Sequence, residues 1–210
     1  MTTLILDTFA EAAYIADRRE KGLDRYDEVW DGVYIMSPLA NNEHQRLASR
    51  LSTIMDLVIG MELEGIAFCG CNVSDLDQEW KHNYRCPDVA AFLPSTAAQD
   101  RGAHWHGGPD FAVEITSPGD KTWDKLEFYA SVGTRELLIV ERDPWELVLL
   151  RLQEDKLIEA GRLSLTSGQV LSSQAVPFNF SLSLKNCRPT IEVKHQADGR
   201  MWYAQGDELK

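Results

Sequence analysis

The chain has 210 residues, 44% apolar and 26% charged, which is typical of one soluble globular domain and excludes a low-complexity protein. No run of about 18 apolar residues occurs, so the sequence predicts no membrane-spanning helix. The net charge is −12, from 21 basic and 33 acidic residues, which argues against an extended basic surface for nucleic acid while leaving room for a local basic patch.

The first part of the chain carries signals for two helices and a hairpin. Residues 8–20 predict a short amphipathic helix. Asp31-Gly32 lies between two β-prone runs, which favours a hairpin because Gly accepts a positive φ. Asn41 or Asn42 then caps a helix that runs to about residue 60. The apolar positions expected on the two helices are Phe9, Ala12, Ala13, Ile15 and Ala16, and then Leu47, Leu51, Ile54, Val58 and Met61.

The rest of the chain predicts a sheet. A helix is expected at about 121–132, closed by Gly133. Short strand-like pieces continue to about residue 193, and a polar stretch follows in which Trp202 and Tyr203 are possible anchors. Strands are expected at 66–73, 85–93, 110–117, 135–142 and 145–152, with a polar loop at 94–108.

This order of elements predicts an α/β (α+β) fold in which a mixed central β-sheet is flanked by helices. One domain is expected over residues 1–210, because no repeat or Pro/Gly/Ser-rich linker divides the chain. The start of the chain lacks the basic and long apolar regions of a signal peptide, so the expected location is cytoplasmic. The four cysteines lack zinc or redox spacing and are expected to be free thiols.

Two acidic residues occupy strands in which a carboxylate is costly. Asp88 follows Pro87 at the head of an apolar run, and Glu114 lies inside the run FAVEIT. A carboxylate among apolar residues needs a partner or a metal ion. The alternative for Asp88 is an exposed strand end, and for Glu114 an edge strand with the side chain facing water.

Lys125 is the third candidate. With about 100° per residue, Leu126, Phe128, Tyr129 and Val132 form one apolar face of its helix, and Lys125 projects near the middle of that face. Its ammonium is therefore expected to point at the sheet. The alternative is that the side chain bends to the rim and reaches water, as lysines often do.

Together these residues predict a site for a hard divalent cation. Mg²⁺ or Mn²⁺ prefers carboxylate oxygens and keeps several waters. Such an ion lowers the pKa of a bound water and polarises a phosphate, and a nearby ammonium can offset the charge that develops. Asp88 and Glu114 are the expected ligands, with the backbone carbonyl of Ile115 and waters completing the shell.

The motifs resemble a known family. EVWDGVYIMSP, the His of ANNEHQRL, PDVAAF and then VEITSPGD followed by DKLEFYASVGTRELLIVERDPW occur in the order found in the Uma-type restriction endonuclease family. That family belongs to the PD-(D/E)xK nuclease superfamily. The resemblance covers about residues 8–155, with the nuclease core at about 25–155, and implies a restriction-endonuclease-like fold and metal-dependent cleavage of DNA.

The resemblance also carries over roles. Asp88 matches the Asp of the PD motif, and Glu114 matches the acid of the (D/E)xK element. The sequence departs from the superfamily at Thr116, which stands where a Lys is usual; in the Uma-type family the Lys is commonly displaced to the next helix, where Lys125 lies. His44 and Glu28 also match recurrent family positions.

These further residues have ordinary alternatives. His44 could be a helix cap or core residue or could face the site, and Glu28 could bind a second metal ion or lie at a solvated strand end. Ser117 and Asp120 could cap the following helix. His104 and His106 have no third ligand nearby and are read as loop residues.

Three functions remain open at this stage. The first is a metal-dependent endonuclease acting on DNA, for which a homodimer is expected because paired subunits can cut both strands. The second is a binding module that keeps the nuclease fold without activity, which Thr116 and the acidic charge favour. The third is a structural partner in an oligomer.

Overall fold

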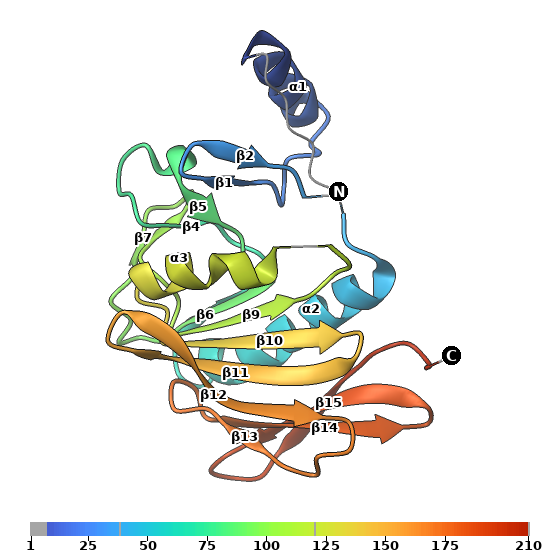
Figure 1. Ribbon diagram of the computed structural model, residues 1–210. Helices are drawn as coiled ribbons and strands as arrows, with labels where there is room; N and C mark the ends of the chain where they lie inside the picture. The colour runs from blue at the N-terminus through green and yellow to red at the C-terminus, as the bar shows by residue number, and fades with distance from the viewer. Residues whose placement is uncertain (1–7, 38, 120, 210) are drawn as a thin grey trace.

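The structure is a computed structural model that describes residues 8–37, 39–119 and 121–209, with side chains described from residue 12 onward. At its centre lies a sheet in the order β12-β11-β10-β9-β6-β3 (Figure 1). β9 and β10 are parallel and the other neighbours are antiparallel, so the sheet is mixed. Its strands are β3 (Ile66–Phe68), β6 (Val89–Phe92), β9 (Phe111–Ile115), β10 (Glu136–Arg142), β11 (Trp145–Gln153) and β12 (Lys156–Ser164).

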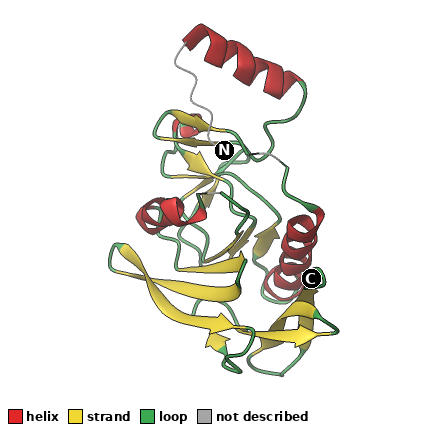
Figure 2. Cartoon of the chain, turned by 45° about the vertical axis from the view of Figure 1, so that its right-hand side comes forward, coloured by secondary structure: helices red, strands yellow, loops and turns green. Residues whose placement is uncertain are grey.

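Helices cover both faces of this central sheet (Figure 2). On one face lies α2 (Asn42–Met55), which continues as a π-helical turn, Asp56–Gly60. On the other lies α3 (Leu126–Ser131), which follows a 3-10 turn, Thr122–Lys125. α3 also forms the crossover that the parallel pair β9 and β10 requires.

The strand period of two sorts the side chains of β9 between the two faces. Val113 and Ile115 pack in the core cluster of α2, whereas Ala112 packs in the cluster of α3. Glu114 alternates with Val113 and therefore faces α3. The Glu114 carboxylate therefore lies between the central sheet and α3.

A second sheet, in the order β13-β14-β15-β16, packs against the same core as α2. Phe180 of this sheet stacks on Phe111 of β9, with ring centroids 5.5 Å apart. α2 is also tied to the segment after β16, since Arg46 bonds Asp207 at 2.7 Å and the Asp207 amide donates to Glu43 at 2.6 Å. The strands are β13 (Leu171–Ser172), β14 (Phe178–Lys185), β15 (Arg188–His195) and β16 (Met201–Gln205).

A third sheet, in the order β2-β1-β5-β4-β8-β7, lies between α1 and the central sheet (Figure 1). The hairpin of β1 and β2 turns at Asp31-Gly32, which have φ of 48° and 84°, as the Asp-Gly pair predicts. Its strands are β1 (Glu28–Trp30), β2 (Val33–Ile35), β4 (Val73–Ser74), β5 (Tyr84–Arg85), β7 (Gln99–Asp100) and β8 (Trp105–His106), with a 3-10 turn, η2, at Trp80–His82.

Three strand predictions need correction. The strand expected at 66–73 divides into β3 and β4, which belong to different sheets, because Gly70 between them has a φ of 76°. The strand expected at 85–93 divides into β5 and β6 around Pro87, which has no amide N–H for a ladder. The loop expected at 94–108 contains β7 and β8.

The predicted bounds and buried positions agree best with the structure for α2. Leu47, Leu51, Ile54 and Val58 are at most 1% exposed, but Met61 is 72% exposed because the helical segment ends at Gly60. The helix expected at 121–132 is α-helical only over 126–131, and Gly133 ends it with a φ of 82°.

α1 (Thr8–Glu20) lies where the sequence predicts it and projects from the rest of the molecule (Figure 1). Its expected apolar side does not pack. Ala12, Ala13 and Ala16 are exposed and Ile15 is half-buried, while Phe9 lies outside the described side chains. Alanines bury little apolar area, so they hold a short helix weakly against a surface.

Candidate active site

Asp88 and Glu114 come together at one end of the central sheet. Antiparallel pairing sets Val89 of β6 against Val113 of β9. Because partner numbers run in opposite directions in such a pair, one further step sets Asp88 opposite Glu114. The Oδ2 atom of Asp88 accepts the Ile115 amide at 2.7 Å, which fixes this carboxylate against the end of β9.

The two carboxylates differ in their environment. The Asp88 side chain is 22% exposed, whereas that of Glu114 is 5% exposed. Burial raises the pKa of Glu114 to about 8, although the charge of Lys125 opposes this shift. Glu114 therefore holds a proton near neutral pH until a cation or a higher pH removes it.

Lys125 points at the sheet. Its Nζ donates to Oε1 of Glu114 at 3.0 Å and to Oε1 of Glu28 at 2.9 Å. Burial by itself lowers the pKa of Lys125, but the charges of the two carboxylates raise it above its ordinary value. The ammonium is therefore permanent, and the side chain does not bend to the rim.

Glu28 is buried at 3% exposure, which overturns the expectation of a solvated strand end. Its Oε1 also accepts the Cys86 amide at 2.8 Å, and its Oε2 accepts the Trp30 indole N–H at 2.8 Å. Both oxygens are thus occupied by protein donors. This bonding makes Glu28 a support for Lys125, and a role for Glu28 in binding a second metal ion stays a prediction.

His44 faces Asp88. Its Nε2 lies 2.8 Å from Oδ1 of Asp88, and its Nδ1 lies 3.2 Å from the Ser117 hydroxyl. The Asn41 cap holds the backbone of His44 at the first turn of α2. Both oxygens of Asp88 are therefore oriented, one by His44 and one by the Ile115 amide.

Two residues that sequence reasoning missed complete the arrangement. The Tyr129 hydroxyl donates to Oε1 of Glu114 at 2.5 Å, and Tyr129 lies one helical turn after Lys125. Arg142 donates to the Thr116 carbonyl at 2.8 Å and to the Ser117 hydroxyl at 3.0 Å. Two sequence features could have identified them. Tyr129 lies four residues after Lys125, on the same face of a helix, and Arg142 is a basic residue at the end of the apolar strand β10.

The remaining candidates lie beside the site or away from it. The Thr116 hydroxyl donates to Glu141 at 2.9 Å. Ser117, expected as a helix cap, instead contacts His44 and Arg142, and Asp120 lies outside the described residues.

The two loop histidines lie in or next to β8. His104 is buried, with its Nε2 bonded to the Leu76 carbonyl at 3.1 Å, and His106 lies in β8. Neither joins a ligand cluster: within the described ranges, no group of three His, Cys, Asp or Glu side chains is placed to hold a metal ion. All four cysteines carry free thiols.

The donors at Asp88 and Glu114 fit a hard cation. Two oriented carboxylates suit Mg²⁺ or Mn²⁺, which take most of their shell from water and substrate, and do not suit Zn²⁺, which needs three or four protein ligands. Among the described residues, every hydrogen bond to Glu114 goes to its Oε1. The Ile115 carbonyl stays a predicted ligand.

A mixed sheet flanked by helices, with two carboxylates and a lysine at one strand end, defines a nuclease-like protein of restriction-endonuclease-like fold. A family model, Uma2, described as "putative restriction endonuclease", matches residues 12–185, and the chain belongs to this family. Both the fold and the family inferred from the sequence motifs are confirmed. No curated protein matches the chain.

Solved structures that are similar in fold include the crystal structure of a "putative nuclease" of a family of unknown function from Anabaena variabilis. The TM-score is 0.55 at 17% sequence identity, and the match covers 72% of this chain and 84% of the other. At this identity the likeness shows the fold. Across the described residues, no helix is long and apolar enough to cross a membrane.

Proposed function

We propose that the protein is a metal-dependent endonuclease that hydrolyses phosphodiester bonds in DNA, with Asp88, Glu114 and Lys125 at its active site. One observation carries the proposal. The register of β6 and β9 brings Asp88 opposite Glu114, and the Lys125 ammonium lies 3.0 Å from the Glu114 carboxylate. Membership of a nuclease family supports the same reaction class.

Each residue has a role that its contacts support. Asp88 and Glu114 would hold Mg²⁺ or Mn²⁺, and the ion would supply an activated water and polarise the scissile phosphate. Glu114 would bind the ion in its ionised form, and burial raises the pKa of this carboxyl to about 8. Lys125 offsets the negative charge of the carboxylates and positions the water. His44 keeps Asp88 in one orientation.

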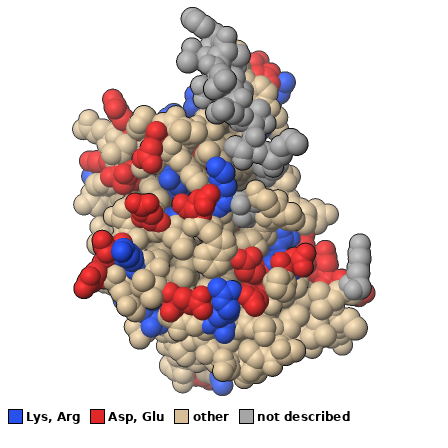
Figure 3. Space-filling view, in the orientation of Figure 1, with Lys and Arg blue, Asp and Glu red and all other residues tan. Residues whose placement is uncertain are grey.

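DNA as the substrate rests on the family. The face in Figure 3 carries many acidic side chains with Lys and Arg between them, as expected for a chain of net charge −12. We therefore expect weak, strongly salt-dependent binding to duplex DNA. A homodimer in the cytoplasm is part of the same proposal, because two copies of the site can cut two strands.

A plasmid-nicking assay at low salt tests the proposal. Wild type is expected to cut with Mg²⁺ or Mn²⁺, while Asp88→Asn and Glu114→Gln lose cleavage and keep the wild-type circular dichroism spectrum. Glu146→Gln is the matched control, because Glu146 lies on β11 in an exposed ion pair with Arg162. Mn²⁺ binding by calorimetry is the second readout and is lost with Asp88→Asn.

Two outcomes would count against the nuclease. Wild type that never cuts with any divalent ion but still binds DNA supports the inactive binding module. If Glu114→Gln cuts as fast as wild type, Glu114 is not part of the active site.

A further inference from the structure

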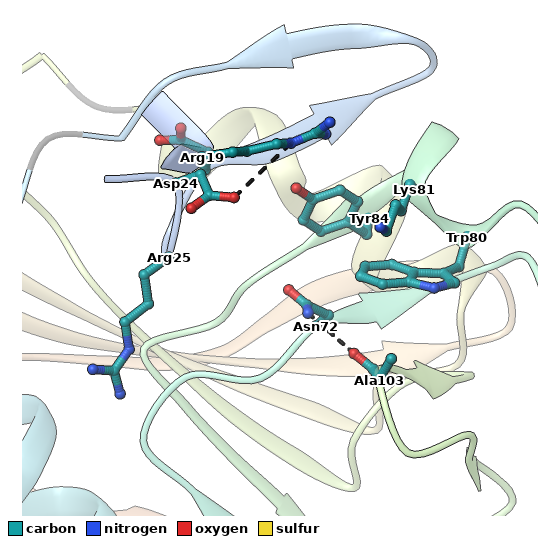
Figure 4. Close-up of a pocket in the computed structure, with 9 residues that line it drawn as sticks. Arg19, Asp24, Arg25, Asn72, Trp80, Lys81, Tyr84 and Ala103 are labelled. Carbon is teal, nitrogen blue, oxygen red and sulfur yellow. Dashed lines mark hydrogen bonds and ion pairs between the residues drawn. The ribbon is translucent and has the colours of Figure 1, made fainter. Parts of the chain in front are cut away.

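A cavity of about 320 Å³ lies between the end of α1 with the loop after it on one side and η2 with β5 on the other (Figure 4). Its size is within the range of sites that bind small molecules, about 300–1,000 Å³. Its lining does not include Lys125 or Tyr129, the residues bonded to Glu114. The side chains that give it chemical character are Arg19, Arg25, Asn72, Trp80, Lys81 and Tyr84.

The cavity is locally positive on an acidic chain. Arg19, Arg25 and Lys81 contribute three cations. Of its two acids, Asp27 is already neutralised by Arg18, which lies outside the lining and bonds it at 2.7 Å. Asp24 lies 4.0 Å from Arg19 and offsets one of the three charges, so the lining keeps a surplus of two positive charges. An anion such as a phosphate is therefore favoured here.

The other wall is aromatic. The Trp80 ring stacks on His104 with centroids 5.0 Å apart, which holds the indole in place from one face. Tyr84 meets Trp80 edge-on at 5.2 Å. In Figure 4 the Tyr84 hydroxyl and the Asn72 side chain point toward the cavity. Fixed aromatic rings beside cations are how proteins bind unpaired bases, because every base has a face that stacks.

Arg25 leads from the cavity toward the carboxylates. Its side chain extends away from the aromatic wall (Figure 4), and its guanidinium lies 5.4 Å from the Tyr26 ring. That ring packs on Gly70, where an added Cβ would meet it at 3.1 Å. The Gly70 amide in turn donates to the Asp88 carbonyl at 3.1 Å. Only two residues therefore separate Arg25 from Asp88 along this path.

We propose that the cavity binds one nucleotide of a single-stranded segment of DNA, with its base against Trp80 and Tyr84 and its phosphate held by Arg19 and Lys81. The strand continues along Arg25 to Asp88. The inference rests on the proposed nuclease function for the identity of the ligand. A base that is paired in a duplex does not fit this cavity, so duplex DNA would enter it only where its two strands are locally separated.

The test measures binding without cleavage. A fluorescein-labelled oligothymidylate of about 12 nucleotides is titrated with the full chain in EDTA and low salt, and anisotropy is recorded. Trp80→Ala is expected to weaken binding by roughly 5- to 150-fold, the usual effect of removing one stacking ring, and Trp80→Phe to restore most of it. Lys81→Gln and Arg19→Gln each lower the salt slope by about 0.7.

Matched controls lie on other surfaces. Tyr203→Ala removes a ring that is 44% exposed on β16, and Lys156→Gln removes an exposed cation on β12; both are expected to bind like wild type. Duplex of the same length is expected to bind more weakly than the single strand. Melting curves verify that each variant is folded.

Three results would overturn the inference. Folded Lys81→Gln and Arg19→Gln that bind like wild type exclude the cavity, even if Trp80→Ala fails to fold. Equal binding of duplex and single strand excludes an unpaired base. Free thymidine monophosphate that binds at least as tightly as the oligonucleotide assigns the cavity to a free nucleotide. None of these results depends on cleavage, so the proposed function stands or falls separately in the nicking assay.

Discussion

Replacing Lys125 with Met tests whether one ammonium stabilises two buried carboxylates. Methionine keeps most of the side-chain volume and removes the bonds to Glu28 at 2.9 Å and to Glu114 at 3.0 Å. Removing one partner of a buried ion pair typically lowers the free energy of unfolding by about 3–5 kcal/mol. We expect the lower end, about 3 kcal/mol, at pH 7, because Glu114 is already largely protonated there and Glu28 keeps two other N–H donors.

The loss of unfolding free energy in Lys125→Met should be larger at alkaline pH. Glu114 has a folded-state pKa above its unfolded value, so its contribution to stability is complete below the unfolded pKa and declines as the pH rises to about 8. Lys125 lowers this pKa, so its removal moves the end of the decline to higher pH. Above pH 8 the free energy of unfolding therefore falls more steeply in the variant than in wild type, by up to about 1.4 kcal/mol per pH unit.

Urea unfolding at pH 7 and pH 9.5 measures both effects. Lys156→Met is the control, because Lys156 is exposed on β12. Adding Glu28→Gln to Lys125→Met should recover part of the loss, since it removes a buried carboxylate that has lost its bond to the ammonium. Lys125→Met with wild-type stability at both pH values would refute the reasoning, and so would a loss that does not change with pH.

Four further predictions concern the site and the assembly. Cleavage with Mn²⁺ should rise by up to tenfold per pH unit until about pH 8, because only ionised Glu114 binds the ion; a rate that is flat from pH 6 to 9 contradicts this. Tyr129→Phe removes a bond that lowers the pKa of Glu114, so the midpoint of that profile should move to higher pH and the free energy of unfolding should fall by about 1 kcal/mol in urea titrations. His44→Ala should weaken Mn²⁺ binding by about 10- to 100-fold in calorimetry, and an unchanged affinity would remove its positioning role. Light scattering at micromolar concentration should give twice the chain mass of 23.7 kDa, and a clean monomer would end the dimer proposal.

The sequence predicted elements well where the signal is local. The Asp31-Gly32 turn and the buried stripe of α2 depend on residues that are close in the chain. The division of 66–73 between two sheets was not predictable in the same way, since β4 pairs with β8, about 30 residues further along the chain, as well as with β5. Local propensity indicates that a strand forms and does not identify its partner.

The same limit applies to the candidate site. The positions of Asp88 and Glu114 could be predicted, because a carboxylate inside an apolar strand is costly. The burial of Glu28 could not, because its donors come from Cys86 and Lys125, 58 and 97 residues away. Arg142 was missed for the same reason: its bonds to Ser117 and Glu43 form only because the end of β10 lies beside the first turn of α2.

The attachment of α2 to the late part of the chain bears on the order of folding. His44 depends on α2, and α2 is held by Asp207 and by the core that β14, β15 and β16 complete. These contacts join residues about 160 positions apart, so they form only after the ribosome has released the segment through Asp207. His44 is therefore not yet held in place in a nascent chain that already contains Asp88, Glu114 and Lys125. We expect the site to become competent only when synthesis has passed β16.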